Sequence, residues 1–409
     1  MANLQRQIES MTAFYQKSCR GSGALVLGLN TEHFVMNLDG TPIEYEQLKP
    51  VISSLQGAHD EPLYEEGVYL GHRNSLFAIK ICPGCQVAIS VAPRSSVREL
   101  MTIYESCYTR LCAALAENGL QAKTIGINPV RQTEKLPLLP TTRCMTLDRY
   151  LKNTGSTGGE LLRASASTRI SVSYTDEADF VRKYRVASLI TPLLAILTDN
   201  APLYHGTTNT RCSVRTYLAS DADPDRCGTL PGLMKSSFGF TACAELLLQK
   251  PLVVARHGTR IVGVGRKSAF EVYSSFLGQN DIEQILSMFF FDVHPGRQIT
   301  LCAADSLPPR FAAAYAQLIK TIFSSPAIQE SVLRRYKDVD KEQIDAAKLG
   351  ICRSGYQAQV YGRSAAGEVD WLMAQAKSHA AAPEERRMLE PLCSLAARHK
   401  SLRQTARYV

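Results

Sequence analysis

The amino-acid sequence predicts an α+β fold in which an antiparallel sheet is flanked by helices. Stretches of alternating apolar and polar residues follow one another through short turns, which is typical of hairpins. Longer stretches have apolar residues at helical spacing. Strands and helices do not alternate regularly along the chain, so the parallel sheet of βαβ units is not expected.

The first part of the chain is expected to supply a helix and several strands. Residues 1–20 have helical spacing. Residues 23–38 alternate like a strand and end at an Asp-Gly turn. Residues 45–55 are predicted to form a short helix that contains a proline. Residues 67–93 then predict strands in antiparallel succession.

The centre of the chain contains the two clearest helices. Residues 95–119 are strongly amphipathic, with a serine as N-cap and Gly119 just past the C-terminal end. Residues 169–176 alternate like a half-buried strand. The next segment, 177–200, predicts a long helix that carries one proline.

The second half follows a loop rich in Gly, Pro and Asp at residues 220–232. Residues 281–290 predict a helix, residues 297–305 a strand, and residues from about 325 to 409 a helical C-terminal part. No repeat or linker-like segment is present. We therefore expect one domain over residues 1–409.

Composition excludes several classes of protein. The chain is 45% hydrophobic and 21% charged, as in an ordinary globular protein, and its net charge of +8 is spread along the sequence. The basic C-terminal stretch lacks interleaved aromatic residues, so a nucleic-acid partner is not expected. No apolar run is long enough for a membrane span, and the N-terminus lacks the apolar core of a signal peptide. A cytoplasmic protein with reduced thiols is expected.

One turn raises a chemical question. Cys82 and Cys85 flank a Pro-Gly pair in "IKICPGCQVAISVAP". The C-x-x-C spacing lets two sulfurs reach one metal ion, although strong zinc motifs contain two such pairs. A redox dithiol usually opens a helix, whereas this turn joins two strands. The two cysteines can also be read as small apolar fillers.

Six stretches resemble known motifs. They are GLNTEHFV (28–35), CPGCQVAISVAP (82–93), LLRASASTRISVSYTDEADFVRKYRVA (161–187), DADPDRCGTLPG (221–232), SSFGF (236–240) and ITLCAADSLP (299–308). Together they resemble the bacterial glutamate–cysteine ligases, ATP-dependent carboxylate–amine ligases that are distantly similar to glutamine synthetase. The resemblance runs from about residue 20 to beyond residue 320. It implies a glutamine-synthetase-like fold with a curved antiparallel sheet.

The resemblance also implies a chemistry. In that family, glutamates on the strands bind magnesium ions that hold the ATP phosphates, and the γ-carboxylate of glutamate becomes an acyl phosphate that the amine of cysteine attacks. Hard cations must bridge a highly charged triphosphate to carboxylate oxygens. Most of the positions that match these acids, and some of their neighbours, carry other residues here. The replaced positions are Asn30, Cys82, Ala88, Arg169, Ser173, Thr300 and Cys302. The family's tryptophan falls on Ala219.

These replacements are expected to share faces of strands. Side chains two apart on a strand point the same way. Asn30 should therefore share a face with Glu32, and Thr300 with Cys302. Five retained positions are candidates for substrate or nucleotide binding, and the resemblance implies that one of them, Arg215, matches a family arginine placed to meet phosphate or substrate. The five are Glu32, Gln86, Arg215, Asp225 and Arg226.

Three hypotheses remain open at this stage. The first is a degenerate homologue, unable to use Mg-ATP, that acts as a regulatory partner of an active ligase or binds a small amino-acid-like ligand. The second is a repurposed site in which Cys82, Cys85 and Cys302, with His33 and His294 as candidate neighbours, hold zinc or an iron–sulfur cluster. The third is an ATP-dependent carboxylate–amine ligase with altered substrates.

Overall fold

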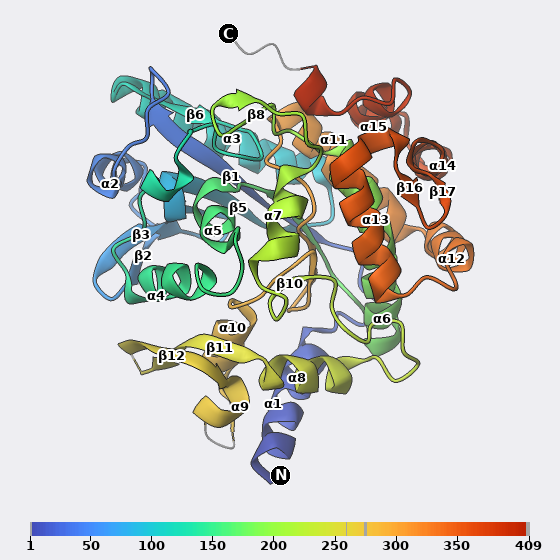
Figure 1. Ribbon diagram of the computed structural model, residues 1–409, viewed down its shortest axis with the longest axis horizontal. Coiled ribbons are helices and arrows are strands. Elements are labelled where there is room, and N and C mark those ends of the chain that lie inside the picture. Colours follow the sequence, from blue (N-terminus) through green and yellow to red (C-terminus); the bar gives the residue numbers. More distant parts are fainter. Residues whose placement is uncertain (1, 259, 274–275, 406–409) are drawn as a thin grey trace.

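The computed structural model describes residues 2–258, 260–273 and 276–405. Within them the central element is a nine-stranded antiparallel sheet in the order β14-β15-β7-β1-β5-β4-β3-β2, with β6 paired to β1 (Figure 1). The strands are β1 (Leu27–Asn37), β2 (Glu61–Glu65), β3 (Val68–Arg73), β4 (Phe77–Cys82), β5 (Gln86–Arg94), β6 (Leu120–Lys123), β7 (Thr168–Val172), β14 (Val293–His294) and β15 (Ile299–Leu301). The predicted α+β class and antiparallel pairing are confirmed.

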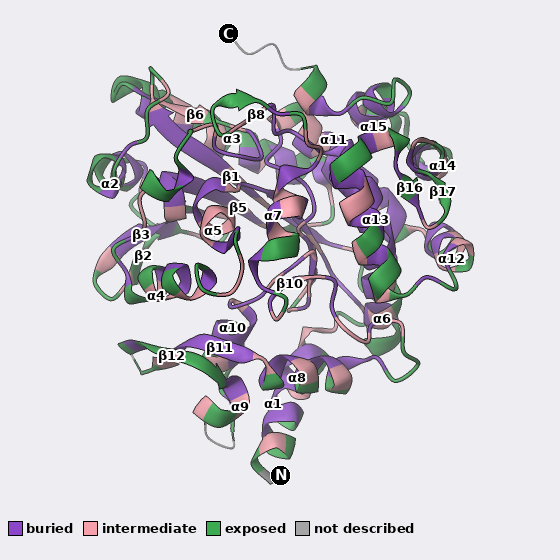
Figure 2. Cartoon of the chain, in the orientation of Figure 1, coloured by how far each residue is buried: buried purple, intermediate pink, exposed green. Residues whose placement is uncertain are grey.

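Long helices cover one face of this sheet. α3 (Val97–Glu117) packs on β5, α11 (Pro309–Ser324) packs on β7, and α6 (Glu177–Leu197) reaches β14 and β15. Ser96 caps α3 by accepting a hydrogen bond from the Glu99 N–H, as the sequence indicated. The strands between the helices are mostly buried (Figure 2). Apolar burial on this face holds the sheet in place.

Shorter helices stand over the other face. α4 (Thr142–Leu151), α5 (Gly158–Ala164) and α7 (Val214–Ala222) lie in front of β1 and β5 in Figure 1. They leave a space above the strands, because they contact one another and segments outside the central sheet more than its strands. That space contains the candidate site.

A smaller layer lies beside the N-terminal helix. α1 (Ala2–Ser18) packs against α8 (Phe240–Gln249), next to the hairpin of β11 (Pro251–His257) and β12 (Arg260–Ser268). The short helices α9 (Ala269–Val272) and α10 (Gln279–Leu286) complete it. Figure 1 shows this layer below the sheet, on the side where the chain begins.

The C-terminal part is helical. It consists of α12 (Pro326–Arg335), α13 (Lys341–Ser354), α14 (Ala365–His379) and α15 (Pro383–Ala396). α15 packs on α11, and α13 on α6 and α7. Apolar residues from Ile8 to Leu402 join one contiguous core. Among the described residues, no helix is long and apolar enough to cross a membrane.

Several predicted elements end earlier than expected, two of them for reasons that the structure shows. The helix predicted for 281–290 ends at Leu286, and Phe290–Phe291 forms β13, which pairs in parallel with β10 (Cys227–Gly228). The Phe290 N–H donates to the Arg226 carbonyl over 2.8 Å, so a tertiary backbone bond replaces the helical one. The strand predicted for 297–305 spans only Ile299–Leu301, because the backbone after Leu301 leaves the sheet and forms its hydrogen bonds outside the strand ladder.

Candidate functional site

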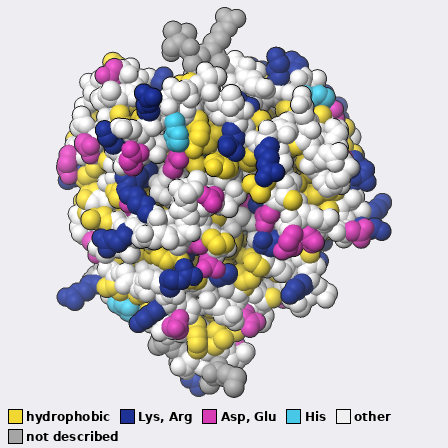
Figure 3. Space-filling model, in the orientation of Figure 1, with side chains coloured by type: hydrophobic (Ala, Val, Ile, Leu, Met, Phe, Trp, Pro, Cys, Tyr) yellow, Lys and Arg dark blue, Asp and Glu magenta, His cyan; other side chains and the backbone are white. Residues whose placement is uncertain are grey.

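A cavity of about 480 Å³ lies between the open face of the sheet and the helices α4, α5 and α7. This size lies within the range of small-molecule sites. Strand residues and the segment after α10 complete its wall. Acidic and basic side chains are interspersed over the face of the molecule seen in Figure 3, without a large area of one sign. That pattern gives no support on this face for a nucleic-acid partner.

The sheet arranges the replaced positions in cross-strand rows. Glu32 of β1 is opposite Ala88 of β5, and Ala88 is opposite Lys80 of β4. In the next row Asn30 of β1 is opposite Arg169 of β7. Since side chains on a strand alternate between faces, these rows point toward one face. The predicted sharing of faces is confirmed for the strand residues.

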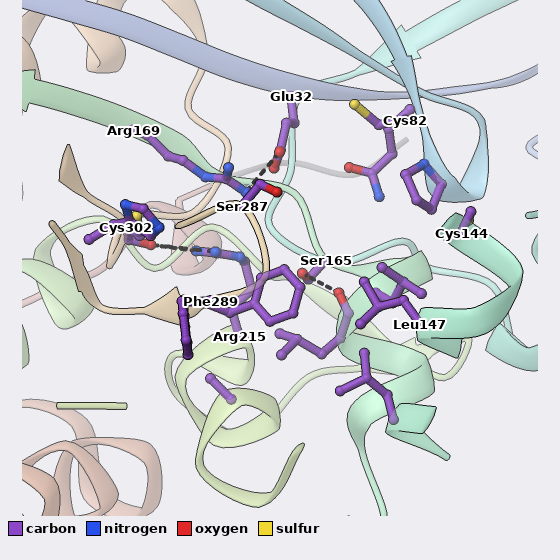
Figure 4. Close-up of a pocket in the computed structure, with 18 of the residues that line it drawn as sticks. Glu32, Cys82, Cys144, Leu147, Ser165, Arg169, Arg215, Ser287, Phe289 and Cys302 are labelled. Carbon is purple, nitrogen blue, oxygen red and sulfur yellow. Dashed lines mark hydrogen bonds and ion pairs between the residues drawn. The ribbon is translucent and has the colours of Figure 1, made fainter. Parts of the chain in front are cut away.

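Glu32 and Arg169 form an ion pair inside the cavity (Figure 4). Arg169 Nη2 lies 2.9 Å from Glu32 Oε1, and both the N–H and the hydroxyl of Ser167 donate to Glu32 Oε2 over 2.8 Å. The Glu32 carboxylate raises the pKa of Arg169. The carboxylate is therefore already neutralised by the protein.

Arg215 extends from α7 toward the end of β15. Its Nη1 donates to the Ala304 carbonyl over 2.7 Å and lies 3.8 Å from Asp305 Oδ1. Burial raises the pKa of Asp305 to about 7. Cys302 lines the cavity beside this pair, and burial raises the pKa of its thiol. Arg215 thus forms part of the cavity wall.

The Pro-Gly turn is held by backbone contacts. The Gly84 N–H donates to the Pro137 carbonyl over 2.8 Å. Gln86 Nε2 donates to the Arg163 carbonyl over 3.1 Å, and a Cβ on Gly84 would lie only 2.1 Å from the same oxygen. Gly84 has φ +72°, which favours glycine. Gln86 lines the cavity, but its amide nitrogen is used to hold this turn.

The four predicted metal ligands are not brought together. Cys82 and Cys302 line the cavity, whereas Cys85 is buried in the main apolar core. His33 lies on the opposite face of β1, between Thr124 and Tyr104. Burial lowers the pKa of His33 to about 3 and raises that of Cys85 to about 12.

Nowhere in the described ranges do three or more His, Cys, Asp or Glu side chains form a group that could hold a metal ion. The structure therefore does not bring Cys82, Cys85, Cys302 and His33 together as a zinc or iron–sulfur site, because strand alternation and the turn direct Cys85 and His33 away from the cavity. His294 does line the cavity, but its Nε2 is bonded to the Leu286 carbonyl over 2.8 Å.

The magnesium donor set of the family does not fit this cavity either. Among the described residues three carboxylates line it. Glu32 is paired with Arg169, and Asp292 is paired with the buried Lys348. The third, Glu65, comes from the far strand β2. Ala88 offers no oxygen, and the Thr300 hydroxyl is bonded to that of Ser171 over 2.8 Å.

Two predicted binding residues lie outside the cavity. Arg226 is fully buried, donates to the Met288 carbonyl over 3.0 Å and lies 2.9 Å from Asp223. Asp225 pairs with Lys250 over 2.7 Å. The expectation that these two meet substrate is not supported, because both side chains hold the loop to its neighbours.

Ser173, a predicted site residue, also lies away from the cavity lining, because β7 ends at Val172 and the Ser173 hydroxyl accepts the Val26 N–H. Asn30 is bonded to Ser90 over 2.6 Å and does not itself line the cavity.

The sequence interpretation missed several lining residues. Lys80 is two residues before Cys82 on β4, so its face could have been inferred from strand alternation. Arg143 and Leu147 come from α4 and Phe289 from the segment after α10, and no local pattern predicts their position. Arg143 donates to Gln284 and Ser287 and fixes α4 to α10.

The antiparallel sheet with a cavity on one face has the architecture of a carboxylate–amine ligase. The solved glutamate–cysteine ligase of Francisella tularensis in complex with AMP has a similar fold, with a TM-score of 0.55, 9% identity, and coverage of 92% of this chain and 82% of that one. At this identity the likeness shows the fold alone.

The sequence itself identifies the family. The profile of glutamate–cysteine ligase family 2 matches residues 26–403, and the chain belongs to this family. It is 23% identical to the chloroplastic glutamate–cysteine ligase B of Oryza sativa subsp. japonica over 388 residues, which covers 85% of this chain and 78% of the relative. It is 24% identical to the chloroplastic glutamate–cysteine ligase of Brassica juncea over 340 residues, which covers 80% of this chain and 65% of the relative. The predicted family is confirmed.

Proposed function

We propose that this protein is a family member that has lost Mg-ATP-dependent ligation, uses the cavity to bind a small ligand and acts as a ligand-responsive partner of an active ligase. The observation that carries the proposal is the ion pair between Glu32 and Arg169. Glu32 matches a family metal ligand, and a guanidinium takes the place of the cation that it would otherwise meet.

The hydrogen bonds of Glu32 support this reading. Its two oxygens accept from Arg169 and twice from Ser167. Mg²⁺ requires near-octahedral oxygen coordination at short distances, and several of its ligands must be supplied without competing donors. Displacing the guanidinium would leave Arg169 without its acid in a partly buried position, which costs free energy.

A working ligase with altered substrates is the second candidate. Arg215 favours it, since it lines the cavity at the position that the resemblance assigns to phosphate or substrate recognition. Its guanidinium already donates to the Ala304 carbonyl, however, and lies near Asp305. Structural bonds therefore account for this arginine without a phosphate.

Calorimetry tests the loss of the magnesium site. We expect the affinity for a non-hydrolysable ATP analogue to be the same in millimolar Mg²⁺ and in chelator. A variant that combines Arg169→Gln, Ala88→Glu and Thr300→Glu is the matched comparison, and its affinity should rise when Mg²⁺ is added. A clear Mg²⁺-dependent gain in the unmodified protein would refute the proposal.

The partner role is tested by size-exclusion chromatography. The protein is mixed with an active ligase of the same family from the same cell, with and without small metabolites. Co-elution that depends on a metabolite supports the role. Independent elution under all conditions refutes it and leaves only the ligand-binding part of the proposal.

A further inference from the structure

We propose that the cavity binds a small carboxylate that carries an apolar chain or ring, with its carboxylate between Lys80 and Arg169. This inference rests on the proposed function, because it uses the room that the missing acids leave. The ligand class follows from two features of the cavity: cations on the sheet face, one of them without an acidic partner, and an apolar opposite wall.

Glu32 and Lys80 line the cavity from strands on either side of Ala88, whose own side chain is buried. Ala88 is central in the row formed by Glu32, Ala88 and Lys80 on three neighbouring strands. Adjacent strands are about 4.8 Å apart, so the backbones of Glu32 and Lys80 are separated by about 10 Å.

Lys80 supplies the unpaired cation. It lines the cavity, and its ammonium forms no hydrogen bond or ion pair with any residue that the structure describes. Cys82 stands next to it on the same face of β4, and both Lys80 and Arg169 act to lower the pKa of this thiol, against the larger effects of burial and of Glu32. The two cations therefore act on the same part of the cavity.

Arg169 can contribute a second donor. Its Nε donates to the Ser167 hydroxyl and its Nη2 to Glu32, whereas Nη1 forms no bond with the described part of the chain. Its side chain is 40% exposed, which leaves the guanidinium accessible from the cavity. A carboxylate can accept from a lysine and an arginine together, with charge-assisted hydrogen bonds at both oxygens.

The other lining charges do not favour a second anion. Asp292 is matched by Lys348, and Arg143 is held by Gln284 and Ser287. Glu65 on β2 adds a negative charge to the wall. The cavity is thus suited to one negative charge rather than to a triphosphate.

The opposite wall is apolar. It is formed by the helix residues Leu147 and Leu151 of α4, Leu161 and Leu162 of α5, and by Phe289. Figure 4 shows Leu147 and Phe289 across the cavity from Glu32 and Arg169. Ala219 of α7, where the family has a tryptophan, also lines the cavity and leaves further room. Burying an apolar group there stabilises the complex by about 25 cal/mol for each Å² removed from water.

Calorimetry in chelator with 3-phenylpropionate and 4-methylpentanoate tests the inference. Their neutral amides have nearly the same shape and lack the charge, and acetate has the charge without the apolar body. We expect both carboxylates to bind, and the amides and acetate to bind at least about tenfold more weakly, as expected for a charge-assisted hydrogen bond or for lost apolar burial.

Two variants locate the site. Lys80→Met should weaken binding of 3-phenylpropionate by about tenfold or more, since one charge-assisted bond is lost. Lys123→Met is the matched control, because Lys123 is an exposed strand lysine of the same sheet outside the cavity, and should leave binding unchanged. Ala219→Trp should weaken the binding of 3-phenylpropionate, because the indole ring would fill the apolar side of the cavity.

Three results would overturn the inference: no binding of either carboxylate, equal binding of acids and amides, or equal affinities for the Lys80 and Lys123 variants. Each of these leaves the proposed loss of Mg-ATP ligation untouched. Mg²⁺-dependent nucleotide binding would contradict the proposed function even if the carboxylates bind. The two failures are therefore distinguishable.

Discussion

Replacing Gly84 with alanine tests whether the Pro-Gly turn is a structural clamp for the cavity. Gly84 has φ +72°, and a left-handed conformation costs a residue with a Cβ about 1–2 kcal/mol. The added Cβ would lie 2.1 Å from the Arg163 carbonyl oxygen, so the turn and α5 must move apart. That movement weakens the 2.8 Å bond from Gly84 to Pro137, which contributes about 1 kcal/mol.

We therefore expect Gly84→Ala to lower the free energy of unfolding by about 3 kcal/mol or more. Unfolding entropy is about 2 cal/mol/K per residue, so for this chain of 409 residues 1 kcal/mol shifts the Tm by about 1 °C. The expected shift is about 3–4 °C, which circular dichroism or differential scanning fluorimetry can measure.

Gly119→Ala is the matched control. Gly119 has φ +71°, almost the same as Gly84, but a Cβ there would meet nothing within 4 Å. Gly119→Ala should therefore lower the free energy of unfolding only by the cost of the left-handed conformation, about 1–2 kcal/mol. Equal shifts in the two variants would refute the argument that contact with Arg163 fixes the turn.

Three further predictions concern charges and thiols in and around the cavity. Arg169→Met should lower the free energy of unfolding by about 1 kcal/mol, because Glu32 loses its cation but keeps two hydrogen bonds from Ser167. Adding Glu32→Gln to this variant should recover part of the lost stability. A double-mutant cycle measured by thermal unfolding that shows no coupling between the two residues would contradict this prediction. Asp305 has a folded pKa raised to about 7 by burial, so the folded state binds a proton more tightly than the unfolded state and stability should fall as pH rises from about 4 to 7. Asp305→Asn should flatten that slope in Tm measurements, and an unchanged slope would show that another group causes it. Burial, and next Glu32, raise the pKa of Cys82 to about 11, so at pH 8 its thiolate fraction is about a hundredfold below that of an ordinary cysteine. Peptide mass spectrometry should find slow alkylation of Cys82, and labelling as fast as that of free glutathione would be inconsistent with this burial.

The strand positions were largely predictable from the sequence. Glu32 and Asn30 are two apart on β1, and alternation alone places this pair on one face. Thr300 and Cys302 both line the cavity as the same rule suggests, although β15 itself ends at Leu301. The same rule excludes His33 from the cavity face, because it is adjacent to Glu32 on the strand and therefore points to the other side of the sheet, toward α3. Alternation would also have placed Lys80 on the cavity face, because it is two residues before Cys82 on β4. The motif resemblance directed attention to acids that were lost and away from Lys80, which lies just outside the matched motifs.

The rest of the site depends on contacts between distant segments. Cys85 has φ +52° in the turn, which breaks the alternation and directs its side chain to the core. Arg226 lies in a loop that resembles the family closely, yet its guanidinium is used to hold β11 and the segment after α10. Phe289 reaches the cavity only because β13 pairs with β10 and ends the preceding helix. Local patterns contain no signal for such long-range pairing.

The loss of ligation is tested most directly by an assay for its products. The full chain is incubated with Mg-ATP, glutamate and a panel of amines that includes cysteine, and ADP and γ-glutamyl products are measured by mass spectrometry. We predict no ADP above the enzyme-free rate and no γ-glutamyl product. Stoichiometric ADP and γ-glutamyl amide, lost in the Glu32→Gln variant, would contradict the proposal that Arg169 has replaced the metal ion at this glutamate.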